Sequence, residues 1–315
     1  MKAKEILRKS WIVFVLITLV VIFSFGNSAF FTGSNLMNII RQVSMLVIVC
    51  VGMTFVLIAG GIDLSVGSQI SIVGVVTATL LSNGVNPGLA CVIGIGLSTL
   101  VGVLNGMFIA FTLVPPLIAT LGMMQVLQGL GYIISSGKNI YGLPDSIKFI
   151  GQGYLSFLPI PVIIAIVLTI VGMFILNKTY TGRYFYAIGS NAEVSRLSGI
   201  KVKMVKTISF GLCGLFTGIA GIIMMARVNS GSPIVGRGFE MDVLTAAVLG
   251  GVSVNGGEGK LSGAVIGALI IGVLSNGLII MNVSEYYQMV IKGMVLILAI
   301  TFDSLSNKKY QANAA

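Results

Sequence analysis

"PGLACVIGIGLSTLVGVLNGMFIAFT", residues Pro87–Thr112, runs for 26 positions without one charged side chain. A helix needs about 20 mostly apolar residues to cross the hydrocarbon core of a bilayer. This stretch is long enough for that crossing, and its glycines would let neighbouring helices approach closely. It predicts a transmembrane helix and directs attention to similar runs elsewhere in the chain.

The composition of the 315-residue chain agrees with this interpretation. Hydrophobic residues make up 56% of the sequence, charged residues only 9%, and the mean hydropathy is +1.04. A soluble domain has about a quarter charged residues, so a water-soluble fold is excluded. The net charge of +10 is not arranged as a basic face with interleaved aromatics, which argues against nucleic-acid binding.

Apolar runs that meet or approach the length of a span occur ten times, so we predict an all-α integral membrane protein with about ten transmembrane helices in a single domain, residues 1–315. The eighth run is a dozen residues long and predicts a half-helix or a tilted extension of its neighbour. The runs are Trp11–Phe31, Val43–Ile62, Leu64–Leu81, Pro87–Thr112, Leu117–Ser135, Pro159–Asn177, Thr207–Ala226, Val243–Val254, Leu261–Met281 and Tyr286–Phe302.

The N-terminal sequence combines basic residues with an apolar run, as a signal peptide does. No small-x-small cleavage site follows closely, which favours an uncleaved first span. Catalytic chemistry has little support: the chain has no histidine, no phosphate-binding loop and no nucleophile motif. The cysteines Cys50, Cys91 and Cys213 all lie in apolar runs without paired spacing, so we expect no disulfide, metal or cofactor.

The distribution of Lys and Arg predicts which loops face the cytoplasm, because cytoplasmic loops carry an excess of cations. With a cytoplasmic N-terminus, ten spans also return the C-terminus to the cytoplasm. Cytoplasmic segments then hold thirteen cations: Lys2, Lys4, Arg8, Lys9, Lys178, Arg183, Arg196, Lys201, Lys203, Lys206, Lys260, Lys308 and Lys309. External segments hold five: Arg41, Lys138, Lys148, Arg227 and Arg237.

Six of these cations gather in one central loop, Lys178–Lys206. Within it, "GSNAEVSRLSG" (Gly189–Gly199) places Ser190 or Asn191 where a side chain can cap a helix, and Gly199 where a helix would stop. We predict a cytoplasmic helix of about two turns, which is too short to be stable without a partner. The loop would then be a docking element, although an anchor that only fixes topology would need the same lysines.

An internal repeat is suggested by "VGVLNGMFIAF" (Val101–Phe111) and "IGVLSNGLIIM" (Ile271–Met281). They lie in the fourth and ninth runs, and this odd offset would make the two cross in opposite senses. We therefore predict inverted halves of five spans each, a common transporter plan. A weaker echo, "AGGIDLSVG" (Ala59–Gly67) and "LGGVSVNGG" (Leu249–Gly257), does not fit a simple inversion.

Several polar residues fall at membrane depth, where a polar group needs a partner or water. Asp63 would cap the third span or line a translocation path with Ser65, and Asn105 and Asn276 would bond across helices or line the same path. Lys292 is the one cation well inside a predicted span; it would snorkel, pair with Glu285 or Asp303, or take part in coupling. Glu240 and Asp242 would cap the eighth run.

Glycines at helical spacing mark the seventh run: Gly211, Gly214, Gly218 and Gly221. They predict a smooth face for close helix packing rather than a ligand site.

Four long motifs together resemble the membrane permeases of bacterial ATP-binding-cassette (ABC) sugar importers. They are "VGMTFVLIAGGIDLSVGS" (Val51–Ser68), "GRYFYAIGSNAEVSRLSGIKV" (Gly182–Val202), "EMDVLTAAVLGGVSVNGGEGKLSG" (Glu240–Gly263) and "SEYYQMVIKGMVLILAI" (Ser284–Ile300). The resemblance covers the chain from about residue 31 to residue 302. Within the family it is strongest to ribose permeases.

The resemblance implies a type II importer fold in the bacterial inner membrane, acting as a homodimer or with a similar subunit. A tandem-domain ABC ATPase and an extracytoplasmic sugar-binding protein are the implied partners, and ATP would be hydrolysed by the ATPase. It also implies an ATPase-coupling segment formed by Gly189, Ser190, Asn191, Ala192, Glu193, Arg196, Leu197 and Gly199. The alternatives are an ion-coupled transporter, a permease for another small sugar or autoinducer, and a membrane scaffold that transports nothing.

Overall fold

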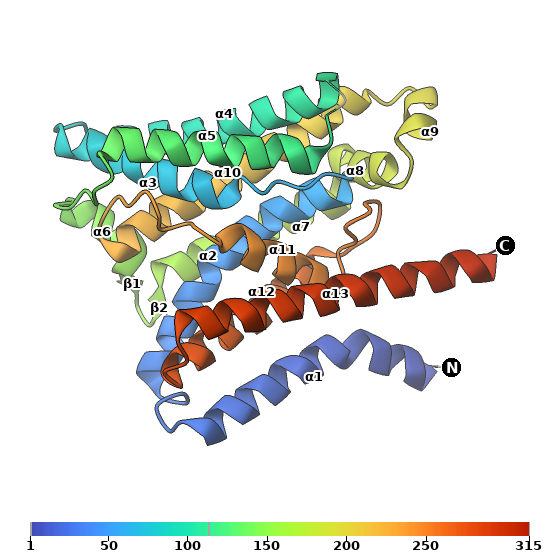
Figure 1. Ribbon diagram of the computed structural model, residues 1–315, viewed down its shortest axis with the longest axis horizontal. Coiled ribbons are helices and arrows are strands. Elements are labelled where there is room, and N and C mark those ends of the chain that lie inside the picture. Colours follow the sequence, from blue (N-terminus) through green and yellow to red (C-terminus); the bar gives the residue numbers. More distant parts are fainter. Residues whose placement is uncertain (1, 113, 315) are drawn as a thin grey trace.

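The structure is a computed structural model that describes the backbone of residues 2–112 and 114–314 and the side chains of residues 12–112 and 114–301. It is a bundle of helices with one two-residue antiparallel hairpin (Figure 1). The elements are α1 (Lys2–Gly26), α2 (Gly33–Ile58), α3 (Val66–Ser82), α4 (Pro87–Thr112), α5 (Pro116–Ser135), α6 (Asp145–Gln152), β1 (Tyr154–Leu155), β2 (Leu158–Pro159), α7 (Ile160–Lys178), α8 (Tyr180–Ser190), α9 (Ala192–Leu197), α10 (Val202–Val228), α11 (Phe239–Leu249), α12 (Leu261–Ile280) and α13 (Glu285–Ala314).

Each predicted apolar run lies on a helix of its own. Among the described residues, α2, α4, α5, α7, α10 and α12 are long and apolar enough to cross a membrane. The apolar part of α1 and the whole of α3 are shorter, and α11 has 11 residues. The all-α membrane architecture is confirmed, and the full number of crossings stays a prediction.

The second run begins earlier than its hydropathy indicated. Helix α2 starts at Gly33, ten residues before the expected Val43, and the hydroxyl of Thr32 accepts a hydrogen bond from the Asn35 amide at its start. Asn35 has partners inside the bundle, because its side-chain amide donates to the Phe30 carbonyl and to the side-chain oxygen of Asn276, so the helix tolerates it. Arg41, expected in an external segment, therefore lies within α2, with its guanidinium 4.9 Å from the centre of the Tyr154 ring.

Helix α2 forms the centre of the bundle, and α4, α5 and α7 form outer layers. In its most apolar stretch 83% of the α2 residues are buried, against 17% in α5 and 22% in α7. The outward faces of α5 and α7 carry Ile118, Ile133, Val167 and Ile170, which are all exposed. Such faces match lipid tails, whereas most of α2 is covered by protein.

The predicted glycine stripe packs α10 closely against α4, and the two helices run antiparallel. A Cβ atom on Gly102 would lie 3.2 Å from the Cα of Gly214, and one on Gly106 would lie 2.7 Å from the Cα of Thr207. Ser98 adds a hydrogen bond to the Gly214 carbonyl at 2.7 Å. The stripe is therefore a packing face, as predicted.

Helices α4 and α12, which carry the repeated motif, also run in opposite directions. Helix α12 is antiparallel to α2, because Gly272 lies at Val43 and Ala264 at Cys50. Helix α10 is antiparallel to both α2 and α4. Inverted halves require this opposition, and the repeat itself stays a prediction.

The eighth run is a half-helix preceded by a non-helical segment of turns. Residues 229–238, which we call the re-entrant segment, descend beside α3 before α11 begins. Near the start of the segment Gly231 forms an isolated antiparallel β-bridge with Ile140. Near its end the Gly236 amide donates a hydrogen bond to the Ser71 hydroxyl at 2.9 Å. Non-helical backbone is tolerated at membrane depth where protein or water covers it.

The N-terminal end of α1, the C-terminal end of α13 and the α8–α9 pair lie at the same end of the molecule, on the right of Figure 1. Helix α6 and the hairpin lie toward the opposite end. This arrangement matches the expectation that both termini and the central loop share one side of the membrane.

Candidate functional site

The central loop folds into two helices, of which only the second was predicted. Helix α8 begins after Thr179, whose hydroxyl accepts a hydrogen bond from the Gly182 amide at 3.2 Å. Its aromatic and cationic residues gave no clear helical signal in the sequence. Arg183 lies 4.5 Å from the centre of the exposed Tyr180 ring, a cation–π contact outside the apolar bundle.

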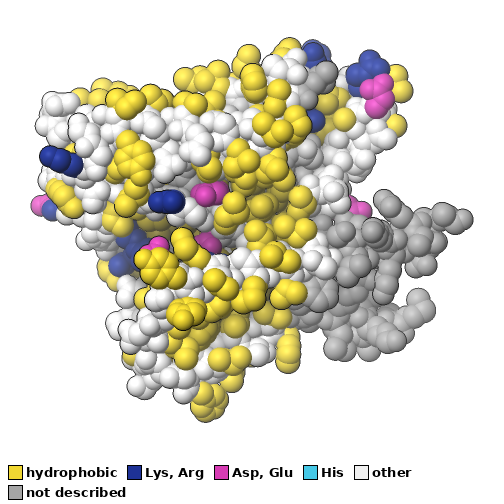
Figure 2. Space-filling model, in the orientation of Figure 1, with side chains coloured by type: hydrophobic (Ala, Val, Ile, Leu, Met, Phe, Trp, Pro, Cys, Tyr) yellow, Lys and Arg dark blue, Asp and Glu magenta, His cyan; other side chains and the backbone are white. Residues whose placement is uncertain are grey.

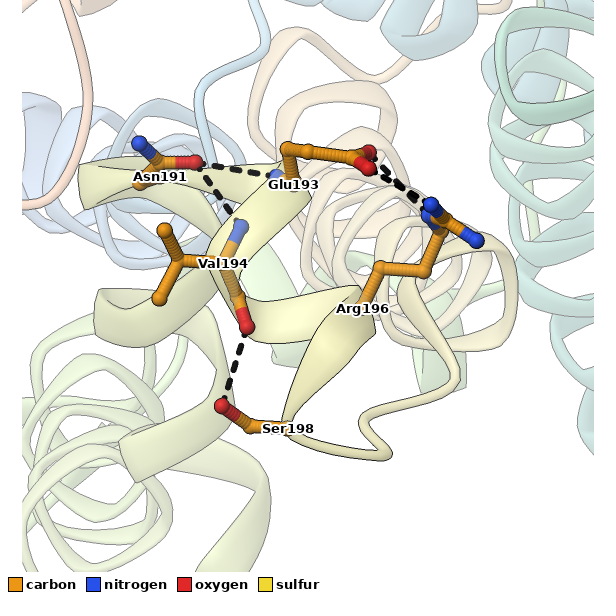
Figure 3. Close-up of polar contacts among 5 residues, drawn as sticks. All are labelled: Asn191, Glu193, Val194, Arg196 and Ser198. Carbon is orange, nitrogen blue, oxygen red and sulfur yellow. Dashed lines mark hydrogen bonds and ion pairs between the residues drawn. The ribbon is translucent and has the colours of Figure 1, made fainter.

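Helix α9 is the short helix expected from "GSNAEVSRLSG", and Asn191 rather than Ser190 caps it. The Asn191 side-chain oxygen accepts hydrogen bonds from the amides of Glu193 and Val194, both at 3.0 Å (Figure 3). Gly199 follows its last turn with a φ of +87°, a left-handed conformation that glycine adopts without steric cost. Local sequence chemistry fixes both ends of α9.

The outer surface of α9 combines exposed apolar side chains with an ion pair. Val194 is 58% exposed and Leu197 is 73% exposed. Arg196 donates from Nε to the Glu193 carboxylate at 3.0 Å, and this hydrogen-bonded charge lowers the pKa of Glu193 (Figure 3). An exposed ion pair contributes little stability to a six-residue helix, so α9 needs a partner to be stable. Its exposed apolar residues are available to contact that partner.

A groove of about 600 Å³ continues this surface between the end of α4 and the start of α10. Met107 and Phe111 line it from α4, and Lys203 lies 4.6 Å from the centre of the Phe111 ring. Arg196 and Lys201 also line the groove. We call α9 and this groove together the α9 surface; it is apolar with a cationic rim.

Four glycines, Gly60, Gly189, Gly256 and Gly257, tie the end of α8 to the bundle, and we call them the glycine junction. The Gly257 amide donates to the Ile58 carbonyl at 2.9 Å. A Cβ atom on Gly189 would overlap that same carbonyl, and one on Gly256 would lie 2.9 Å from the Cα of Gly60. The two loops of the weaker sequence echo thus meet at Gly189, immediately before α9.

Asp63 lies in a buried polar network, and it does not cap α3 as proposed. Position Ser65 precedes the helix, and no side chain caps its first turn. Asp63 Oδ1 accepts from the Ser65 amide at 2.9 Å and hydroxyl at 2.6 Å, and Asn105 donates to the Ser65 hydroxyl at 3.0 Å. Gln69, which the sequence did not single out, donates to Asp63 at 3.3 Å and completes the network.

Asn276 belongs to a different cluster near the other end of α2. Its side-chain amide and that of Asn35 exchange two hydrogen bonds of 3.0 Å. Asn105 and Asn276 therefore bond across helices, one of the two roles expected for them. The four candidate path residues, Asp63, Ser65, Asn105 and Asn276, are all buried and lie in two separate clusters, so their path-lining role stays a prediction.

The charged residues of α11 do not cap that helix in the expected way. Gly238 occupies the position before it, and Glu240 accepts a hydrogen bond from the Gly238 amide at 3.2 Å. Asp242 pairs instead with Lys292 of α13 at 2.7 Å. This is the partner of Lys292; the expected partner Glu285 is not, and the Asp303 side chain lies outside the described residues.

Known proteins similar to this chain are transport proteins of bacterial membranes. The "Ribose import permease protein RbsC" of Bacillus subtilis is 40% identical over 290 residues, which cover 91% of this chain and 90% of that protein. Its namesake in Escherichia coli K12 is 40% identical over 310 residues, 96% of each chain. The "L-arabinose transport system permease protein AraH" of E. coli K12 is 39% identical over 281 residues, 89% of this chain and 85% of the relative.

No solved structure matches the chain. A family model described as "Branched-chain amino acid transport system / permease component" matches residues 35–300, which include all but the first two residues of α2 and every helix from α3 to α12. That match covers more than half of the chain, and the identities of 39–40% extend over most of each chain. The chain therefore belongs to this family of membrane permease components.

Proposed function

We propose that the chain is the membrane permease subunit of an ATP-driven importer of a monosaccharide, with ribose as the first candidate. The observation that carries this proposal is the 40% identity to two ribose import permeases over more than nine tenths of the chain. Hydrolysis of ATP belongs to a separate subunit, and the α9 surface supplies a place for that subunit to bind.

The proposed partners are a tandem-domain ABC ATPase at the α9 surface and a sugar-binding protein at the opposite end. We also propose that two copies of the chain form the permease, with the path between them. The α9 end then faces the cytoplasm of a bacterial cell, and both termini lie there too. The excess of cations at that end supports this orientation.

Coupling requires that the ATPase bind the two states of the permease differently, since equal binding would shift no equilibrium. The glycine junction offers a rigid link for this purpose. Motion of α9 would reach the α2–α3 loop and the α11–α12 loop together, because backbone at Gly189 contacts both of them. The half-helix α11 would move with the second of these loops.

The sugar is the least constrained part of the proposal. The "D-allose transport system permease protein AlsC" of E. coli K12 is 36% identical over 298 residues, 94% of this chain and 91% of that protein, only slightly below the ribose permeases. A test uses cells that lack this chain and measures uptake of labelled ribose, D-allose and L-arabinose with and without it. Uptake of ribose that stops on ATP depletion but survives an uncoupler is expected; uptake that stops with the uncoupler alone would indicate an ion-coupled transporter.

Leu197→Asp is expected to weaken binding of the ATPase by about tenfold or more, because a charge would replace an exposed apolar anchor of the α9 surface. The measurement is the amount of ATPase that co-purifies with the permease at increasing salt. Leu155→Asp is the matched control: Leu155 is 63% exposed at the opposite end, so that variant should keep the ATPase. Equal ATPase binding by both variants would contradict docking at α9.

A further inference from the structure

The junction between the re-entrant segment and α11 lies about halfway through the membrane. Between Gly231 and Gly236 the segment passes α3 from the level of Gly74 and Ala78 to that of Gly67 and Ser71. Ser71, which accepts a hydrogen bond from the Gly236 amide, lies eleven residues before the end of α3 at Ser82. Eleven helical residues rise about 16 Å, roughly half of a 30 Å hydrocarbon core. Helix α11 then continues for about 16 Å toward the glycine junction.

Charged side chains gather at this depth on one face of the bundle. Arg237, the last residue but one of the re-entrant segment, is exposed, and the Asp242–Lys292 pair keeps 21% and 25% of its two side chains accessible. Figure 2 shows Lys, Arg, Asp and Glu side chains gathered on the face where Figure 1 places α11, well inside the two ends of the molecule. The middle of the outer face of α7, by contrast, carries only apolar residues.

Such a face is poorly suited to lipid. A charged side chain at the centre of a helix in the bilayer costs about 2.5–3.5 kcal/mol by insertion measurements, so charges at this depth face protein or a water-filled cavity. Non-helical backbone at this depth has the same requirement, because its amides and carbonyls need partners or water. Both features occur together here and on the same face.

We propose that this face is the water-filled wall of the translocation path, and that Arg237 is its principal contact for a neutral polyhydroxylated substrate. The inference rests on the proposed function, since a sugar permease needs such a passage. It differs from the expectation that the buried residues Asp63, Ser65, Asn105 and Asn276 line the path.

The chemistry of the wall suits a sugar that must pass without being trapped. The Arg237 guanidinium has several N–H donors for hydroxyl oxygens, while Ile234 and Met241, 52% and 44% exposed, offer apolar surface to the C–H face of a sugar ring. The Asp242 carboxylate can accept from sugar hydroxyls and already has its charge balanced by Lys292. Because this open wall offers few direct hydrogen-bond partners, we expect it to bind the sugar weakly.

Thiol labelling tests the assignment in the complete transporter of permease, ATPase and binding protein in vesicles. Cys50, Cys91 and Cys213 are first replaced by Ala, and Arg237→Cys, Met241→Cys and Ile170→Cys are then made separately. A membrane-impermeant methanethiosulfonate reagent reacts only with a hydrated thiolate. Residue 170 is the matched control, since it is 61% exposed near the middle of α7 on the apolar outer face.

The expected result is that positions 237 and 241 react at least about tenfold faster than position 170, because thiolates form readily only in water. Arg237→Cys should itself reduce sugar transport before any labelling, because it removes the principal substrate contact. Reaction at 237 no faster than at 170, or full transport by Arg237→Cys, would overturn the proposal. Failure of the unmodified transporter to move any sugar would instead count against the proposed function. The labelling rates do not depend on transport, so they test the position of the path separately.

Discussion

Adding a single methyl group at Gly189 is expected to reduce coupled sugar transport by about tenfold or more. A Cβ atom at this position overlaps the Ile58 carbonyl and lies 2.5 Å from the Gly257 amide nitrogen. Because both neighbours are backbone atoms held by their own hydrogen bond, neither can move aside as a side chain would. Overpacking of this kind costs about 1–3 kcal/mol, enough to shift a two-state equilibrium by about fivefold at the low end and more than about a hundredfold at the high end.

The measurement compares Gly189→Ala with Gly96→Ala in vesicles that contain the ATPase and the binding protein. Gly96 lies in α4 with no atom within 4 Å of its added Cβ, so that variant should transport normally. Gly189→Ala should still insert and bind the ATPase, because the α9 surface is unchanged, but ATP hydrolysis should no longer respond to the sugar-loaded binding protein. Normal transport by Gly189→Ala would show that the junction does not carry the coupling.

Hydropathy predicted the helices well because it measures the property that a bilayer selects. It located α4 to the residue and α12 to within one residue. It failed at the start of α2, where Asn35 and Arg41 look like loop residues in sequence but find partners on other elements. A hydropathy run cannot distinguish a polar residue in water from one satisfied inside a bundle.

The candidate site was predictable where its chemistry is local. Asn191 and Gly199 lie within a few residues of the helix that they delimit, so capping rules located α9. The glycine junction joins residues up to 197 positions apart, and no local sequence feature of these glycines predicts that they are in contact. In the sequence, the only sign of the re-entrant segment is a shortage of apolar residues before α11.

The pairing of Lys292 with Asp242 illustrates the same difficulty. The two residues are 50 positions apart, and sequence reasoning sought partners for Lys292 only along its own helix. The structure supplies the carboxylate from α11 because the half-helix packs against α13. A short helix without a full span of apolar residues needs such a contact to fix its position.

Lys292→Met is therefore expected to destabilise the folded permease by about 2–3 kcal/mol, which is less than the roughly 3–5 kcal/mol for breaking a fully buried ion pair. The value is smaller because about a quarter of each side chain is accessible, so water solvates part of the charge on Asp242. Asp242→Asn should have a similar effect on its own. The double variant should cost less than the sum of the two single changes, because it leaves no unpaired charge.

Thermal unfolding of the purified protein in detergent, followed by the buried thiols Cys50 and Cys213, measures these differences. Lys148→Met is the control, since the Lys148–Asp145 pair has a similar N–O distance of 2.7 Å but an Asp side chain that is 93% exposed, and exposed pairs contribute about 0–1 kcal/mol. If the three variants at positions 242 and 292 were additive, the two charges would not interact energetically. Helix α11 would then be held by its apolar contacts alone, and the orientation of the half-helix could not depend on α13 through this pair.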